Sequence, residues 1–290
     1  MINQQSTIND ILKRPEFSGF GEKLFPMDLQ LSKALSLQEL SSSLPWYSHI
    51  STERSVAVLK QLSLSAQTGQ TIFYDIYTEK EKGKDPRKAR TGLFFFRGEK
   101  GASTAIISAG GGFQYVAAIH DSFPHAQELS RQSCNAFALI YRSGARTGSE
   151  DLARAIAFLH EHQEQLGIDM TGYSLWGGSA GARMAAWLGN TGPGPYGEKL
   201  YPKPSAVIMQ YTGLSEVTGQ EPATFAAVGT SDWIADYRIM ERRIQAIKSK
   251  GTPAEIRIYQ GLQHGFGLGE GTKAEAWIDQ ALHFWQEQLA

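Results

Sequence analysis

Short runs of consecutive apolar residues, separated by amphipathic stretches, fill the chain from about residue 100 onward. The runs are too short for helices and are bounded by glycine or polar residues, which is typical of buried strands. They lie at residues 104–109 (TAIISA), 136–141 (AFALIY), 173–176 (YSLW), 206–211 (AVIMQY), 224–228 (TFAAV) and 255–259 (EIRIY). Because such strands are apolar on both faces, we expect a mostly parallel sheet with helices on both sides, an α/β fold.

The amphipathic stretches predict the helices between these strands. They lie at residues 124–134, 151–165, 182–188, 235–249 and 273–289. Residues 71–78 (TIFYDIYT) alternate with period two and are expected to pair with residues 91–97 (TGLFFFR) as an antiparallel edge. The charged stretch between them, residues 79–90, is interpreted as a solvated hairpin loop.

The first 60 residues follow a different, irregular pattern. Phenylalanine and proline stand among glycines, and Asp28 is the expected N-cap of a short helix that ends at Leu40. A second helix is expected to start within residues 51–54 (STER). We therefore predict an N-terminal extension, residues 1–60, packed on a main domain of residues 61–290.

Composition excludes several classes of protein. The formal net charge of −1 gives no basic surface for nucleic acid. The single cysteine, Cys134, excludes an intrachain disulfide and a cysteine-based zinc site. The first residues lack a signal-peptide pattern, and no apolar run approaches the ~20 residues that span a bilayer. We expect a cytoplasmic protein without membrane contact, and no metal or cofactor, because neither zinc spacing nor a P-loop is present.

Residues 171–190 (TGYSLWGGSAGARMAAWLGN) read as strand, glycine-rich turn and helix. Ser179 stands in the turn between Gly177 and Gly181, giving the G-x-S-x-G pattern of a nucleophile elbow. A serine on such a turn takes a strained backbone conformation, and flanking glycines remove the Cβ atoms that would collide. The following helix also directs its N–H groups toward the serine oxygen. The alternative is a glycine-rich helix start without chemistry.

Three further polar or glycine-rich segments follow predicted strands. Gly110, Gly111 and Gly112 come directly after residues 104–109 and could direct backbone N–H groups at an oxyanion. The other two segments are residues 229–233 (GTSDW), which contain Asp232, and residues 260–267 (QGLQHGFG), which contain His264. The carboxyl ends of parallel strands meet at one edge of a sheet, so these groups are expected to lie together.

The chain order Ser179, Asp232, His264 is that of one class of catalytic triads. Asp232 could instead cap the following helix, with Asp236 as the rival acid.

Other chemistry-bearing residues have two readings. His120, Asp121 and His125 could touch a substrate or belong to a solvated loop, and Arg142 is interpreted as a structural ion-pair partner.

From about residue 60 to its end, the chain resembles the α/β-hydrolase superfamily, and within it bacterial carboxylesterases of the hormone-sensitive-lipase-like and acetyl-xylan-esterase-like types. The resemblance rests on AGGGF (109–113), YR (141–142), DLARAI (151–156), GGSAGAR (177–183), GTSD (229–232) and HGFG (264–267). It implies an α/β-hydrolase catalytic domain over residues 61–290. Ala109 departs from the histidine with which lipase-type relatives begin their oxyanion motif.

The resemblance also implies a role for each matching residue. Ser179 is the expected nucleophile, His264 the general base and Asp232 the residue that orients the histidine. The expected oxyanion donors are the backbone N–H groups of Gly111, Gly112 and Ala180. The implied activity is hydrolysis of a small carboxylic ester through an acyl-enzyme.

The substrate is constrained less sharply. Only residues 212–223 separate two strands at a point where lipases insert a lid, which favours short-acyl, water-soluble esters such as acetylated carbohydrates. Phe113, Trp233 and Phe266 are expected to wall the substrate pocket, and residues 1–60 to roof it. The alternatives are an arylformamidase-like amide hydrolase and a ligand-binding homologue without catalysis. The acyl group, the alcohol and the oligomeric state stay open.

Overall fold

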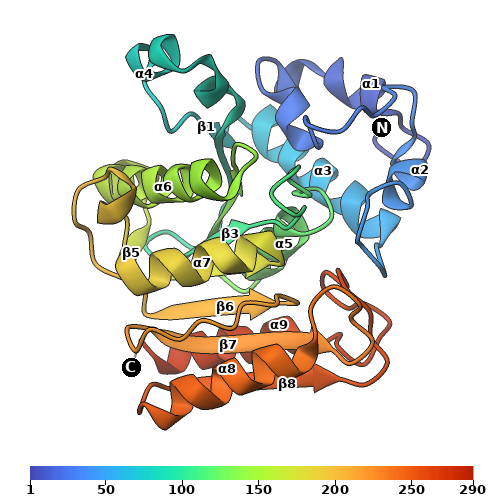
Figure 1. Ribbon diagram of the computed structural model, residues 1–290. Helices are drawn as coiled ribbons and strands as arrows, with labels where there is room; N and C mark the ends of the chain where they lie inside the picture. The colour runs from blue at the N-terminus through green and yellow to red at the C-terminus, as the bar shows by residue number, and fades with distance from the viewer. Residues whose placement is uncertain (290) are drawn as a thin grey trace.

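A computed structural model of the protein describes residues 1–289, which form one twisted eight-stranded sheet flanked by helices (Figure 1). The strand order is β1-β2-β4-β3-β5-β6-β7-β8. The strands are β1 (Phe73–Tyr74), β2 (Gly92–Phe96), β3 (Ser103–Ser108), β4 (Asn135–Ile140), β5 (Asp169–Gly178), β6 (Ala206–Gln210), β7 (Ala223–Gly229) and β8 (Ala254–Tyr259). Strands β4 to β8 and β3 run parallel, whereas β2 is antiparallel to both of its neighbours.

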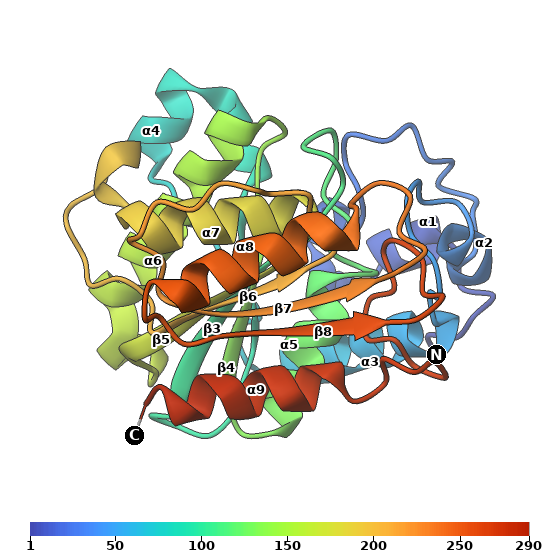
Figure 2. The same ribbon diagram turned by 60° about the horizontal axis from the view of Figure 1, so that its bottom comes forward.

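Helices cover both faces of this sheet. The α-helices are α1 (Ile8–Leu12), α2 (Leu37–Ser41), α3 (Thr52–Gln67), α4 (Glu79–Lys84), α5 (Ser122–Arg131), α6 (Ala145–Leu166), α7 (Ala180–Thr191), α8 (Tyr237–Ser249) and α9 (Trp277–Glu287). Four 3₁₀ helices lie at Pro15–Phe17, Gly21–Leu24, Pro86–Arg90 and Gly194–Tyr196 in this part of the chain. Figure 2 shows α6, α7 and α8 on one face, and α5 and α9 on the other, with α3 packed beside α5.

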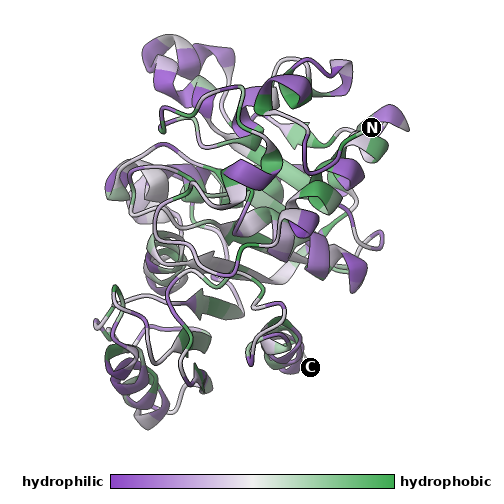
Figure 3. Ribbon diagram, turned by 90° about the vertical axis from the view of Figure 1, so that its right-hand side faces the viewer, coloured by the Kyte–Doolittle hydropathy of each residue, from purple (hydrophilic) through white to green (hydrophobic). Residues whose placement is uncertain are grey.

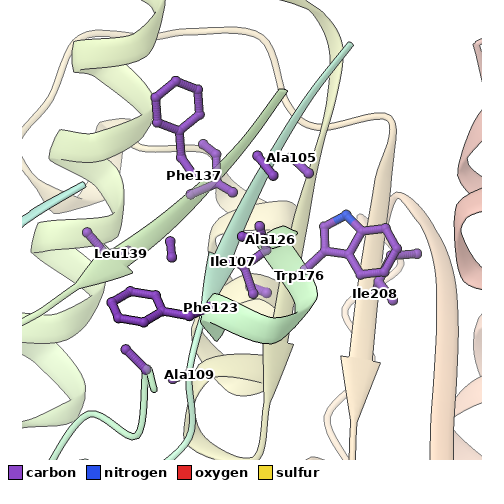
Figure 4. Close-up of a cluster of buried hydrophobic side chains, with 14 of the residues drawn as sticks. Ala105, Ile107, Ala109, Phe123, Ala126, Phe137, Leu139, Trp176 and Ile208 are labelled. Atoms are coloured by element: carbon purple, nitrogen blue, oxygen red, sulfur yellow. The ribbon is translucent and has the colours of Figure 1, made fainter. Parts of the chain in front are cut away.

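The core lies between the central strands and these helices. Ile107, Trp176 and Ile208 are register partners across β3, β5 and β6, and all three are buried. The buried side chain of Phe123, from α5, lies on the same side of the sheet as these three residues (Figure 4). Figure 3 shows the hydrophobic residues concentrated on the central strands and the hydrophilic ones on the outer helices. The predicted α/β fold is therefore confirmed, and so is the burial of the predicted strands except the last, since β8 at the sheet edge is only half-buried.

The predicted helix over residues 28–40 is wrong in its first two thirds. Only Leu37–Ser41 is helical, with Ser36 as its N-cap. The backbone before this helix forms hydrogen bonds with a distant segment: the N–H of Ile8 donates to the carbonyl oxygen of Leu35 at 2.9 Å. A long-range backbone contact thus replaces the local helical bonds. The second predicted helix is confirmed as α3, whose N-cap lies within residues 51–54.

Residues 79–90 are exposed for the most part, as predicted, but they do not form a hairpin loop. Thr78 begins α4 through a capping box with the third residue of that helix. Asp85 then caps the 3₁₀ helix Pro86–Arg90. The antiparallel pairing around this insertion is confirmed, although β1 contains only Phe73–Tyr74. Helix α6 also starts earlier than predicted, at Ala145, directly after Gly144 at φ +106°.

The N-terminal segment lies beyond the carboxyl ends of the strands. In Figure 2 the arrowheads of β6, β7 and β8 point toward the blue and light-blue part of the chain. The buried residues of this segment, such as Ile11, Leu24 and Leu40, belong to the same continuous hydrophobic cluster as the sheet. Among the helices of residues 1–289, none combines the length and apolar character that crossing a bilayer requires.

Candidate active site

Ser179 occupies the sharp turn between β5 and α7. Its backbone has φ +50° and ψ −112°, a conformation that non-glycine residues rarely adopt. The turn is possible because its neighbours are glycines. A Cβ atom on Gly181 would lie 1.9 Å from the carbonyl oxygen of Ser108, and one on Gly177 would lie 2.3 Å from the carbonyl carbon of Gly181. This geometry matches the predicted nucleophile elbow.

The structure brings Ser179, Asp232 and His264 together in one hydrogen-bonded chain. Nε2 of His264 lies 3.2 Å from Oγ of Ser179, and Nδ1 lies 2.8 Å from Oδ2 of Asp232. Because an ionised carboxylate only accepts, this contact assigns the proton to Nδ1 and leaves Nε2 free to accept. Asp232 and His264 are 9% and 4% exposed, so water competes little for these bonds.

The same carboxylate also shapes its own loop. Oδ1 of Asp232 accepts hydrogen bonds from the N–H groups of Ile234 (2.9 Å) and Ala235 (2.7 Å), which fixes the carboxyl plane toward the histidine. The rival acid, Asp236, is the N-cap of α8, where it accepts from the N–H of Arg238. Asp236 therefore has the capping role that the sequence left open for Asp232.

The glycine loop after β3 faces Ser179. Gly111 and Gly112 have φ values of +128° and +62°, which turn their N–H groups away from the sheet ladder. Among the described residues, none accepts a hydrogen bond from the N–H groups of Gly111, Gly112 or Ala180. The N–H of Gly110 is instead bound to Asp121 at 2.7 Å. The three predicted oxyanion donors are thus left free beside the serine.

These groups open into a cavity of about 310 Å³. Its lining residues are Trp46, Tyr47, Gly111, Gly112, Gln114, Ser179, Trp233, Ile234 and His264. Trp46 and Tyr47 come from the N-terminal segment. The Trp46 ring lies so close above the loop that a Cβ on Gly112 would be 2.9 Å from it. The sequence analysis expected residues 1–60 to roof the pocket, and Trp46 and Tyr47 are members of that segment that line the cavity. Their exact places have no local sequence signal, because they reach the site through contacts distant along the chain.

The three aromatic residues expected to wall the pocket have different places. Trp233 lines the cavity and is 70% exposed at its rim. Phe266 is fully buried against Tyr211 and Tyr259, so its interpretation as a pocket wall is wrong and it packs in the core. Phe113 is a wrong prediction as well, since it stacks on Trp187 and is not a cavity-lining residue.

His120, Asp121 and His125 do not form a solvated loop. All three are buried beneath the glycine loop, and none lines the cavity. Asp121 accepts hydrogen bonds from Gly110, from the hydroxyl of Tyr47 (2.8 Å) and from that of Tyr211 (3.2 Å). It is a site residue whose supporting role the sequence did not indicate.

Arg142 binds Asp151 through several hydrogen bonds and also binds Asp85 (2.8 Å), which confirms the structural ion pair. Burial raises the pKa of the Cys134 thiol to about 11, so this cysteine is not a reactive thiolate near neutral pH. Within residues 1–289, no three His, Cys, Asp or Glu side chains gather as a set that could hold a metal ion.

No protein-family model matches the chain, and no curated protein matches it. Among solved structures, an acetyl ester-xyloside bifunctional hydrolase from Caldicellulosiruptor lactoaceticus superposes with a TM-score of 0.65 at 20% identity, covering 74% of this chain and 95% of that one. A thermophilic esterase of Thermogutta terrifontis, Est2, gives a TM-score of 0.59 at 20% identity, covering 68% and 89%.

A third structure has the same architecture. MGS-M1, an α/β hydrolase enzyme from a Medee basin deep-sea metagenome library, gives a TM-score of 0.60 at 19% identity, covering 69% of this chain and 93% of its own. At these identities the likeness concerns the fold. The protein has the α/β-hydrolase fold, as its motifs indicated.

The buried histidine beneath the site gives a prediction about stability. Burial lowers the pKa of His120 from 6.5 to about 4, so between these values the unfolded chain binds a proton that the folded chain does not. The free energy of unfolding is therefore expected to fall as the pH drops from 6.5 to 4, by roughly 3 kcal/mol from this residue alone. Urea unfolding at pH 7, 5.5 and 4.5 measures the slope. The His120→Gln variant should lose that part of it, and equal slopes in both proteins would refute the assignment.

Proposed function

We propose that the protein is a serine hydrolase that cleaves carboxylic esters by acyl transfer through Ser179. The observation that carries the proposal is the hydrogen-bonded chain Ser179–His264–Asp232 at a cavity that also receives unpaired backbone N–H groups. A nucleophile, a base, an orienting acid and oxyanion donors are the parts that acyl transfer needs. A protein that only binds a ligand has no use for such an ordered set.

The geometry supports the following reaction. Oγ of Ser179 attacks the ester carbonyl while Nε2 of His264 takes the hydroxyl proton. Asp232 stabilises the imidazolium through Nδ1, and the N–H groups of Gly111, Gly112 and Ala180 bind the negative oxygen that develops. His264 then gives the proton to the leaving alcohol, and the acyl group stays on Ser179. A water molecule, deprotonated by the same histidine, then attacks the acyl carbonyl. The bond to Oγ breaks, His264 returns the proton to Ser179, and the carboxylic acid leaves.

The cavity favours a short acyl group and a water-soluble ester. Its volume of about 310 Å³ is small, and the ring of Trp46 lies directly against the glycine loop at its wall. An acetylated carbohydrate fits this description, with the exposed indole of Trp233 as a ring-stacking surface at the rim. Two of the compared structures support ester chemistry on this fold: one is a hydrolase of acetyl ester and xyloside, and the esterase of T. terrifontis has been described with propionate bound and phosphorylated by paraoxon.

Removing the nucleophile tests the reaction. Ser179→Ala is expected to abolish the hydrolysis of p-nitrophenyl acetate, because no other group at the cavity can form the acyl-enzyme. His264→Ala should be about as severe, since the two residues act as a unit. Ser231→Ala, an exposed serine of the neighbouring loop, is the matched control and should retain full turnover. Near-wild-type activity of folded Ser179→Ala would exclude the mechanism.

The two aspartates of one loop give a second test. Asp232→Asn is expected to lower kcat by about 10⁴-fold, because the amide favours the wrong histidine tautomer. Asp236→Asn should change kcat little, since asparagine keeps the helix cap and Asp236 makes no bond to His264. Steady-state kinetics of both variants, with circular dichroism to verify folding, make the comparison. Exchanged results would move the acid to Asp236.

Substrate size is tested by an acyl-chain series. We expect kcat/KM to fall from p-nitrophenyl acetate through butyrate to octanoate, because the longer chains exceed the space under Trp46. p-Nitroacetanilide in the same assay separates ester from amide hydrolysis. A value of kcat/KM that rises toward octanoate contradicts the short-acyl proposal, and a preference for the anilide would favour the amide alternative.

A further inference from the structure

Residues 45–49 (PWYSH) form a strained segment that lies across the site, here named the clasp. Trp46 and His49 have φ values of +69° and +52°, although neither is glycine. Such a conformation is unfavourable for a non-glycine residue and persists only where surrounding contacts enforce it. The contacts that hold residues 45–49 in this conformation therefore indicate the role of the clasp.

One end of the clasp is bound to the glycine loop, which here means residues 109–115 after β3. The hydroxyl of Tyr115 donates to the carbonyl oxygen of Pro45 at 2.6 Å, and the Trp46 ring stacks on that of Tyr115. The hydroxyl of Tyr47 donates to Oδ2 of Asp121 at 2.8 Å. The same oxygen accepts the N–H of Gly110, the residue directly before the proposed oxyanion donors.

The other end of the clasp is bound to residues 260–267, the loop after β8 that carries His264 and is here named the histidine loop. The N–H of Ser48 donates to the carbonyl oxygen of Gly265 at 3.0 Å, and its hydroxyl donates to that of His264 at 2.8 Å. The fit is close, because a Cβ atom on Gly265 would lie 2.4 Å from the carbonyl oxygen of Trp46.

The clasp therefore joins two loops that follow non-adjacent strands of the sheet. The glycine loop follows β3 and the histidine loop follows β8, and β5, β6 and β7 lie between these strands. The hydrogen bonds between neighbouring strands fix where each loop begins, but they do not connect the two loops to each other. Residues 45–49 supply hydrogen bonds to both.

We propose that Tyr47 is a positioning residue that acts through Asp121 to hold the glycine loop, and with it the oxyanion donors, in place for the reaction. This inference rests on the ester-hydrolase proposal above. Burial and the Asp121 carboxylate raise the pKa of Tyr47 well above its usual value, so its hydroxyl stays protonated and donates. Tyr211 and Gly110 supply the other bonds of that buried carboxylate.

The expected signature lies in kcat. Oxyanion donors stabilise the transition state when they lie about 2.7–3.1 Å from the developing charge, and they contribute little to substrate binding. Without the Tyr47 hydroxyl, Asp121 loses one of its donors and Gly110 loses a fixed acceptor. A small shift of the loop then lowers kcat and leaves KM nearly unchanged.

The first experiment compares Tyr47→Phe with the wild-type full-length protein on p-nitrophenyl acetate. We expect kcat to fall about tenfold and KM to stay within about twofold. The affinity for a trifluoromethyl ketone, whose serine adduct places an oxyanion in the hole, should fall by the same factor as kcat/KM. Tyr173→Phe is the matched control, because it removes another hydroxyl that donates a hydrogen bond, here to the carbonyl oxygen of Pro202, away from the cavity, and it should leave kcat unchanged.

A double-mutant cycle with Asp121→Asn tests the route of the effect. If Tyr47 acts through Asp121, the double variant is no slower than Asp121→Asn alone. Losses that multiply would mean that Tyr47 acts on the substrate directly, and this would overturn the inference. An unchanged kcat in Tyr47→Phe, or a change in KM only, would overturn it as well, even if Asp121→Asn fails to fold. Absence of turnover in the wild type would instead refute the proposed function.

Discussion

The close approach of β3, β5 and α7 is the constraint on which the site depends. Ser179 can hold its φ of +50° only because Gly177 and Gly181 let the strand, the turn and the helix come within contact distance. The main-chain oxygen of Ser108 occupies the space that a side chain at position 181 would need. The same approach places the end of β3, and therefore the glycine loop, directly beside the serine. The position of the proposed nucleophile thus follows from packing.

Around this turn, the parallel sheet determines which groups can meet. Asp232 follows β7 and His264 follows β8, and both loops arrive at the edge where β5 ends. The sheet brings the groups near one another, and buried hydrogen bonds then fix their orientation. Both carboxylate oxygens of Asp232 are used: one accepts from His264, and the other accepts two backbone N–H groups of its own loop.

The sequence was informative where structure is local. The elbow, the strand ends and the triad candidates each depend on a few consecutive residues, and their predicted places agree with the structure. Contacts between residues far apart in the chain could not be predicted from the sequence. Tyr47 meets Asp121, 74 positions away, and Ser48 meets His264, 216 positions away, so neither contact leaves a pattern. The same limit explains two errors. Phe266 lies after the histidine but turns into the core, and the backbone oxygens of Lys33 and Leu35 accept from the first helix, in a stretch that was expected to be helical itself.

The central claim is that Ser179 is a nucleophile activated by His264. Its most direct test is intact-mass analysis after treatment with a fluorophosphonate, followed by peptide mapping of the adduct. The account predicts one phosphonyl group per chain, located on Ser179, with labelling that slows by orders of magnitude in the His264→Ala variant. Labelling at another residue, or equal labelling rates with and without His264, would contradict it.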